Sequence, residues 1–117
     1  SIAGITVLTA KVPASSMESL RYMGDLIKER LGSVVVVLAA VYDNKANFVA
    51  MVTPDLVARG LNAGQIVKQV AAVAGGSGGG KAELGQAGGK DKRKIDDALK
   101  LVRRLIEGKG RHGDNGA

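Results

Sequence analysis

The residues best placed to do chemistry are the glycines between positions 75 and 89, together with Lys81. Eight of these fifteen residues are glycine, which lets the backbone approach a ligand closely and leaves N–H groups open to bind phosphate. The spacing from Gly75 through Gly80 to Lys81 also matches the phosphate-binding loop of nucleotide-hydrolysing enzymes. However, Ala82 stands where that loop needs a Ser or Thr hydroxyl to hold Mg²⁺, and a helix is expected before it where a strand is required. The segment therefore does not predict a nucleotide-hydrolysis site.

Two other interpretations of the glycine segment stay open. One is a flexible linker, although Leu84, Gln86 and Ala87 interrupt the glycines in a way that a linker does not need. The other is an ordered glycine-rich loop before the last helix, in which backbone N–H groups form a cradle beside Lys81. Such a cradle would bind a phosphate or a backbone oxygen of RNA, and the interrupting residues favour it.

The sequence offers no catalytic or metal-binding constellation. Cysteine is absent, which excludes disulfides and thiolate ligands, and His112 is the only histidine. Asp96 and Asp97 are neighbours in an expected helix, so their side chains diverge by about 100° and cannot act as a catalytic pair. We therefore expect no catalytic residue, no metal site and no cofactor in this chain, and no enzyme activity of the chain on its own.

Positive charge is concentrated near the C-terminus. Nine of the seventeen Lys and Arg residues lie between Lys90 and Arg111, against four acidic residues there, and the net charge is +6. A basic third of a small domain attracts phosphates and predicts salt-dependent binding to nucleic acid, although a solvated helix face would show the same run. Tyr22, Tyr42 and Phe48 are the only aromatic residues, too few for a platform that stacks single-stranded bases. Recognition of RNA by shape and backbone is therefore favoured.

The glycine segment and the basic run together define the predicted RNA-binding set. Its members either expose backbone or carry positive charge for phosphates. They are Gly78, Gly79, Gly80, Lys81, Gln86, Ala87, Gly88, Gly89, Lys90, Lys92, Arg93, Arg103 and Arg104.

The N-terminal elements that must position this set begin with a strand and a helix. Residues 4–12 are rich in β-branched side chains and end at Pro13, which predicts a strand. Ser15 stands three residues ahead of Glu18, a capping-box pattern that starts a helix, and Gly32 supplies its C-terminal stop.

Two strands are expected next. Residues 34–41 are apolar without alternation, as a central strand covered on both faces requires. After a turn at 42–45, the alternating pattern of 46–52 predicts the antiparallel partner of a hairpin. The sheet is therefore predicted to be mixed.

The second half of the chain is predicted to be mainly helical. Pro54 opens a short helical turn, and Asn62 caps a helix that ends at Gly75. A last helix starts at Lys90 or Asp91, and the glycine-rich, polar residues 108–117 are expected to form a flexible tail. The predicted fold is α/β (α+β-like): one domain over residues 1–107, with helices packed on a mixed β-sheet.

The length of 117 residues and the 45% hydrophobic content are typical of a single globular domain. The longest apolar run, 34–41, is far shorter than the ~20 residues that span a bilayer, and the N-terminus lacks the pattern of a signal peptide. We therefore expect no membrane contact and a cytoplasmic location. The chain begins with Ser1 instead of Met, which indicates a fragment of a longer protein.

Three sequence segments also carry a resemblance to a known family. They are Gly-Leu-Asn-Ala-Gly at 60–64, Gly-Gly-Ser-Gly-Gly-Gly-Lys at 75–81 after the intervening helix, and Gly-Gln-Ala-Gly-Gly at 85–89. In this order and spacing they resemble the DHHA1 domain, and specifically the C-terminal domain of alanyl-tRNA synthetases. The resemblance extends from about residue 3 to residue 106.

This resemblance implies a part of a ligase. In that family the C-terminal domain binds the elbow of alanine tRNA and helps present the tRNA to aminoacylation and editing sites on other domains. Those other domains are expected to use ATP, Mg²⁺ and Zn²⁺. The expected partners are tRNA, the other domains of the parent synthetase and, in some members, a second copy in a homodimer.

Two alternatives stay open from the sequence. The domain could belong to a DHH-type phosphoesterase or exonuclease, in which the same fold holds nucleic acid across from a metal site on another domain. That alternative requires an Asp-His-His motif upstream of Ser1. The domain could also be a subunit-interaction module whose glycine segment packs against a partner, and such an association would not share the salt dependence of phosphate binding.

Overall fold

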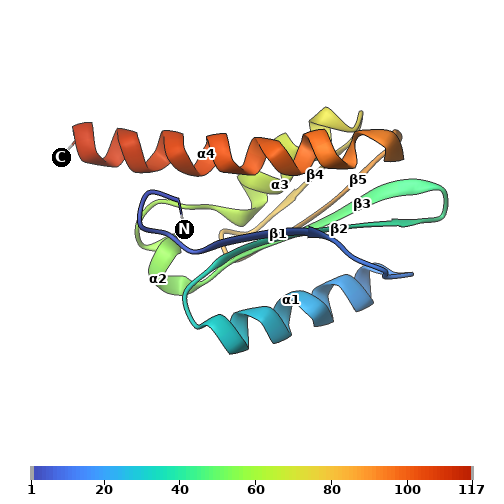
Figure 1. The fold of residues 1–117 in the computed structure, drawn as a ribbon, viewed down its shortest axis with the longest axis horizontal. Coiled ribbons are helices and arrows are strands. Elements are labelled where there is room, and N and C mark those ends of the chain that lie inside the picture. The colour runs from blue at the N-terminus through green and yellow to red at the C-terminus, as the bar shows by residue number, and fades with distance from the viewer. Residues whose placement is uncertain (1, 117) are drawn as a thin grey trace.

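A five-stranded mixed β-sheet with helices on both faces forms the domain (Figure 1). This computed structural model describes the backbone of residues 2–116 and the side chains of residues 2–108. The strand order is β1-β2-β3-β5-β4, with β1 parallel to β2 and every other pair antiparallel. The strands are β1 (Val7–Lys11), β2 (Val35–Tyr42), β3 (Lys45–Val52), β4 (Ser77–Gly80) and β5 (Leu84–Gly89). The predicted fold class, α/β with a mixed sheet, is confirmed.

Helix α1 (Met17–Leu31) covers one face of the sheet and connects the parallel strands β1 and β2 (Figure 1). Its N-cap is Ser16, whose hydroxyl accepts the N–H of Ser19 at 3.1 Å. The predicted cap at Ser15 is therefore wrong by one residue, because the N–H group that needs an acceptor lies three positions after Ser16. The predicted stop at Gly32 is confirmed: φ is 79° there, and its N–H donates to the carbonyl of Lys28 at 2.8 Å.

Strands β2 and β3 form the centre of the sheet. They are joined at Asp43 and Asn44, whose φ angles of 53° and 59° are those of the tight turn that suits twisted antiparallel strands. Along β2, Val35 and Val37 contact the core on one face, and Val36 and Leu38 contact the core beneath α1 on the other. The prediction of a central strand buried on both faces is confirmed.

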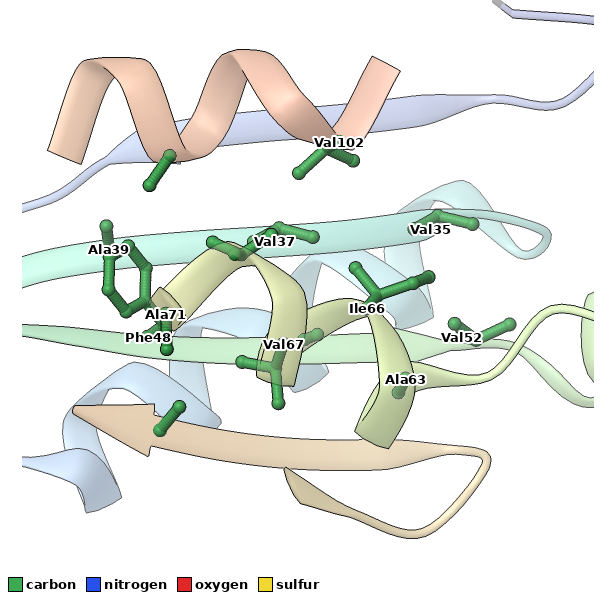
Figure 2. Packing of buried hydrophobic residues seen from close by; sticks show 14 of the residues in the cluster. Val35, Val37, Ala39, Phe48, Val52, Ala63, Ile66, Val67, Ala71 and Val102 are labelled. Atoms are coloured by element: carbon green, nitrogen blue, oxygen red, sulfur yellow. The ribbon is translucent and has the colours of Figure 1, made fainter. Parts of the chain in front are cut away.

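Helices α3 (Ala63–Val73) and α4 (Ile95–Gly116) cover the other face, and the short α2 (Pro54–Val57) precedes α3. Asn62 caps α3 as predicted, accepting the N–H of Gln65 at 3.0 Å. Figure 2 shows Val67 and Ala71 of α3 and Val102 of α4 among buried side chains of β2 and β3. This larger core fixes α3 and α4 on the sheet.

The glycine segment is a pair of strands, so the predicted glycine-rich loop before the last helix is wrong. β5 pairs with β3 from Ala46 opposite Gly89 to Met51 opposite Leu84, and β4 completes the edge of the sheet. Glycine is a poor strand former because it brings no side chain to pack. Here the main-chain ladder and the contact with α3 supply the stabilisation, and neither needs side chains on the strands.

The last helix begins later and runs further than predicted. A 3₁₀ turn at Lys92–Lys94, capped by Asp91, precedes α4, because the Asp91 carboxylate accepts the N–H of Arg93 at 3.0 Å. The backbone of α4 continues to Gly116, where the sequence predicted a tail over 108–117. Each residue added to an existing helix gains one hydrogen bond without the cost of starting a new helix, which favours continuation. The flexibility of that tail stays a prediction, and its side chains from 109 on, His112 included, lie outside the described residues.

Candidate nucleic-acid interface

Four basic residues meet at the end of the sheet where the β2–β3 turn lies. Ala46 of β3 pairs with Gly89 of β5. The next residues outward, Lys45 and Lys90, therefore lie side by side at the end of the two strands. The 3₁₀ turn then brings two further basic residues to the same place. We call Lys45, Lys90, Lys92 and Arg93 the basic corner.

Hydrogen bonds hold the basic corner in place. The Lys92 Nζ donates to the Asn44 Oδ1 at 2.6 Å, which ties the 3₁₀ turn to the β2–β3 turn. The Arg93 Nε donates to the Asp91 Oδ1 at 3.1 Å, and these contacts with Arg93 hold the pKa of Asp91 below its usual value. Among the side chains that the structure describes, the three lysines of the corner have no carboxylate within 4.0 Å. Their charge is therefore available to an anionic ligand.

The remaining basic residues of the predicted set lie in two other places. Lys81 is exposed in the turn between β4 and β5, and Lys90 follows the other end of β5. The six residues of β5 span roughly 20 Å between these two places. Arg103 is exposed on α4 and pairs with Glu107 at 3.1 Å, and Arg104 is its exposed neighbour. The structure thus brings together Lys90, Lys92 and Arg93 but not Lys81 or the two α4 arginines.

Close packing accounts for four glycines of the hairpin: Gly85 and Gly89 approach α3 and its C-cap Ala74, and Gly78 and Gly80 approach the neighbouring strand β5. A Cβ atom added at Gly85 would lie 2.7 Å from the Val67 Cγ1, and one added at Gly64 of α3 would lie 2.5 Å from the Gly80 carbonyl oxygen. Distances this short leave no room for a side chain. Strand register places these members of the predicted set on the α3 side of the sheet: Gly78, Gly80, Ala87 and Gly89.

The other face of the hairpin carries Gly79, Gln86 and Gly88. Gly79 pairs directly with Gln86, and Gln86 pairs with Val49, a member of the core beneath α1. These three residues therefore face the same side as α1. The predicted glycine set is divided between a face used for internal packing and a face that α1 only partly covers.

The sequence prediction missed Asn44 and Lys45. Both residues were expected in the turn at 42–45, and nothing in their types distinguishes them from ordinary turn residues. Only the register between β3 and β5 brings them beside Lys90 and Lys92. A prediction that β5 pairs with β3 would have found them.

The described part of the chain holds neither a metal-binding cluster nor a membrane-spanning helix. No group of three or more His, Asp or Glu side chains there is arranged to hold a metal ion. No helix within residues 2–116 has both the length and the apolar character needed to cross a membrane.

Comparison with known proteins decides the family. A model of the DHHA1 domain matches residues 4–108, nearly the whole described chain. The chain belongs to the DHHA1 domain family. This DHHA1 domain also superposes on the C-Ala domain of the alanyl-tRNA synthetase of Aquifex aeolicus with a TM-score of 0.83 and 30% identity, covering 92% of this chain and 96% of that one.

Curated relatives agree with that superposition. The DHHA1 domain is 49% identical over 106 residues to the alanine-tRNA ligase of Acetivibrio thermocellus and 47% identical to that of Geobacillus thermodenitrificans. Each alignment covers 91% of this chain but only 12% of the relative. The predicted resemblance to the C-terminal domain of alanyl-tRNA synthetases is confirmed, and these relatives favour it over the phosphoesterase alternative.

Proposed function

We propose that this DHHA1 domain binds the elbow of a tRNA and that its parent protein is an alanine-tRNA ligase. The domain would help present the tRNA to aminoacylation and editing sites that lie outside this chain. The observation that carries the proposal is the basic corner, on a domain whose nearly full-length structural match is a synthetase C-terminal domain.

The electrostatics of the basic corner support phosphate binding. Lys45 begins β3 and Lys90 directly follows β5, so the register brings two like charges close together, and like charges opposite each other destabilise a sheet. A bound anion would relieve this repulsion. Lys92 is held toward the same place by Asn44. A phosphate backbone that follows the end of the sheet would contact all three lysines, which is the sequence-independent mode expected for recognition of folded RNA.

A charge-matched pair of triple variants tests the proposal. Lys45→Ala, Lys90→Ala and Lys92→Ala are combined in one chain; Lys11→Ala, Lys28→Ala and Lys68→Ala are combined in the control. Binding to transcribed alanine tRNA is measured between 50 and 200 mM salt. Loss of three phosphate contacts should reduce the slope of log affinity against log salt concentration by about 2.7. The ratio of parent to variant affinity should therefore fall by about 40-fold between 50 and 200 mM salt.

The control variant separates a specific site from general attraction. If both triple variants lose the same affinity and slope, the basic corner is not the site, and the net charge alone explains the binding. The two other places in the predicted set are tested by Lys81→Ala and by the double variant Arg103→Ala and Arg104→Ala. For each variant the salt slope of tRNA binding is measured as above. Equal binding to alanine tRNA and to a second tRNA, with weaker binding to unstructured RNA, is expected of a domain that recognises shape.

A further inference from the structure

A groove lies between α1 and the glycine hairpin, on the face of the sheet opposite α3. Its volume is about 1010 Å³, and it is lined by the first half of α1 and by Gln86 of β5. Tyr22 forms part of its wall and is 64% exposed, the most exposed large hydrophobic side chain in the described part of the domain. The basic corner does not contribute to this groove.

Gln86 has an unsatisfied polar atom. Its Oε1 is buried and has no hydrogen-bond partner in the fold. Buried polar atoms are nearly always paired, so an orphan in a groove indicates a partner that comes from outside the chain. The amide of Gln86 carries both a donor and an acceptor, and rotation of that amide would present either to a bound molecule.

Gly79 and Gly88, which flank Gln86 on the same face, are not required by internal packing. A Cβ atom added at Gly79 would meet no atom within 4 Å, and one added at Gly88 would meet none closer than 3.8 Å. Neither residue has the left-handed φ that favours glycine. Glycine within a strand weakens it, so at these two positions glycine lowers the stability of the domain and internal packing does not explain its presence. The result is a flat surface beside Gln86.

The charges around the groove do not favour phosphate. Glu18 and Asp25 line it together with Arg21, so acidic groups outnumber basic ones. The groove has an exposed aromatic ring and an unpaired amide, and the flat surface of Gly79 and Gly88 adjoins it at Gln86. These are the features that bind an unstacked base, which stacks on aromatic surfaces and forms hydrogen bonds along its edge.

We propose that one unstacked nucleobase of the RNA binds at the margin of this groove, over the adjoining flat surface of Gly79 and Gly88, with its edge toward Gln86. The inference rests on the proposed function, since it assigns a base to the RNA whose phosphates contact the basic corner. Lys90 follows Gln86 by four positions along β5 and its end, which is roughly 13 Å and within reach of one RNA segment. The single exposed Tyr22 thus supplies the stacking surface that the aromatic count alone did not predict.

Nucleosides test the groove without phosphates. The ¹⁵N-labelled chain is titrated with adenosine, guanosine, cytidine and uridine, and with ribose 5-phosphate as the control ligand. At least one nucleoside should shift the side-chain amide resonances of Gln86 and the backbone amides of Gly79 and Gly88, and ribose 5-phosphate should leave them in place. The absence of these shifts with all four nucleosides, or equal shifts with ribose 5-phosphate, would overturn the proposal.

Two variants give the groove a second readout. Gly79→Val covers the flat surface beside Gln86 at a position with room for a side chain, and Gln86→Leu removes the amide while keeping most of its volume. Thr9→Val is the control for Gly79→Val, because it places the same side chain at an exposed position on β1, at the opposite edge of the sheet. The groove variants should abolish the nucleoside shifts and weaken binding of alanine tRNA by about fivefold or more, and the control should do neither.

The two proposals fail in different ways. If the parent chain binds alanine tRNA and both groove variants bind it equally well, the groove proposal is wrong and the basic corner stands. If the chain binds no tRNA, the proposed function is wrong. Groove resonances that shift with the concentration of the chain itself, and not with nucleosides, would identify a contact between copies and would also refute base binding.

Discussion

The packing of α3 on the glycine hairpin makes a sharp prediction for two single substitutions, Gly85→Ala and Gly79→Ala. The two positions lie on neighbouring strands of the same hairpin, but they face opposite sides of the sheet. The new methyl group at Gly85 would lie 2.7 Å from the Val67 Cγ1 and 2.8 Å from the Ala63 carbonyl oxygen, and at Gly79 it would touch nothing. The same chemical change should therefore have opposite effects on stability.

The expected magnitudes follow from these contacts. Gly85→Ala forces α3 away from β5, and overpacking of this kind costs about 1–3 kcal/mol. Gly79→Ala restricts the unfolded chain without strain in the fold, which stabilises by about 0.4–1 kcal/mol. A loss of about 2 kcal/mol at Gly85 lowers the urea midpoint by about 1 M if the slope is about 2 kcal/mol per molar.

Urea denaturation followed by circular dichroism measures both effects, with the slope of the transition checked for constancy. A lowered midpoint for Gly85→Ala and an unchanged or raised midpoint for Gly79→Ala are expected. If Gly85→Ala is as stable as the parent chain, the close approach of α3 to β5 is not the reason for glycine at that position, and the division of the hairpin into two faces fails.

Two further predictions concern the helix caps and pH. Ser16→Ala should lower the free energy of unfolding by about 1 kcal/mol, and Ser15→Ala should change it little, because only the Ser16 hydroxyl accepts a helix N–H. Urea denaturation of the two variants compares these free energies directly. Equal losses in both variants would contradict the assignment of Ser16 as the cap. The hydrogen bond from Ser33 lowers the pKa of Asp55. The ionised carboxylate therefore stabilises the fold at pH values above the ordinary pKa of Asp, and this stabilisation is lost as the pH falls through the lowered pKa. Asp55→Asn should therefore be less stable than the parent at pH 7, and the difference in the free energy of unfolding should shrink as the pH falls below the ordinary pKa of Asp; a difference that does not change with pH would refute the electrostatic origin.

The sequence predicted the elements whose signals lie in their own side chains. The unbroken apolar run of β2, the stop at Gly32 and the cap at Asn62 were recognisable because each depends on a few neighbouring residues. The cap of α1 was misplaced because Ser15 and Ser16 are adjacent and equally suited to the role. Local chemistry thus predicts the existence of an element better than its first residue.

The glycine hairpin and the basic corner could not be predicted in this way. The strand tendency of β4 and β5 comes from pairing with β3 and from contact with α3, and neither is visible in a window of glycines. Lys45 and Lys90 are 45 positions apart in the sequence and become neighbours only through the β3–β5 register. The candidate site therefore depends on long-range pairing.

Two strands built largely of glycine have a consequence for how the domain opens. Because β4 and β5 bury few side chains of their own, their resistance to local unfolding comes mostly from α3 and from the ladder to β3. The hairpin and α3 should therefore exchange their amide hydrogens as one cooperative unit, separately from the β1–α1–β2 unit at the other edge of the sheet. A molecule bound on the hairpin would slow exchange throughout α3 without touching it.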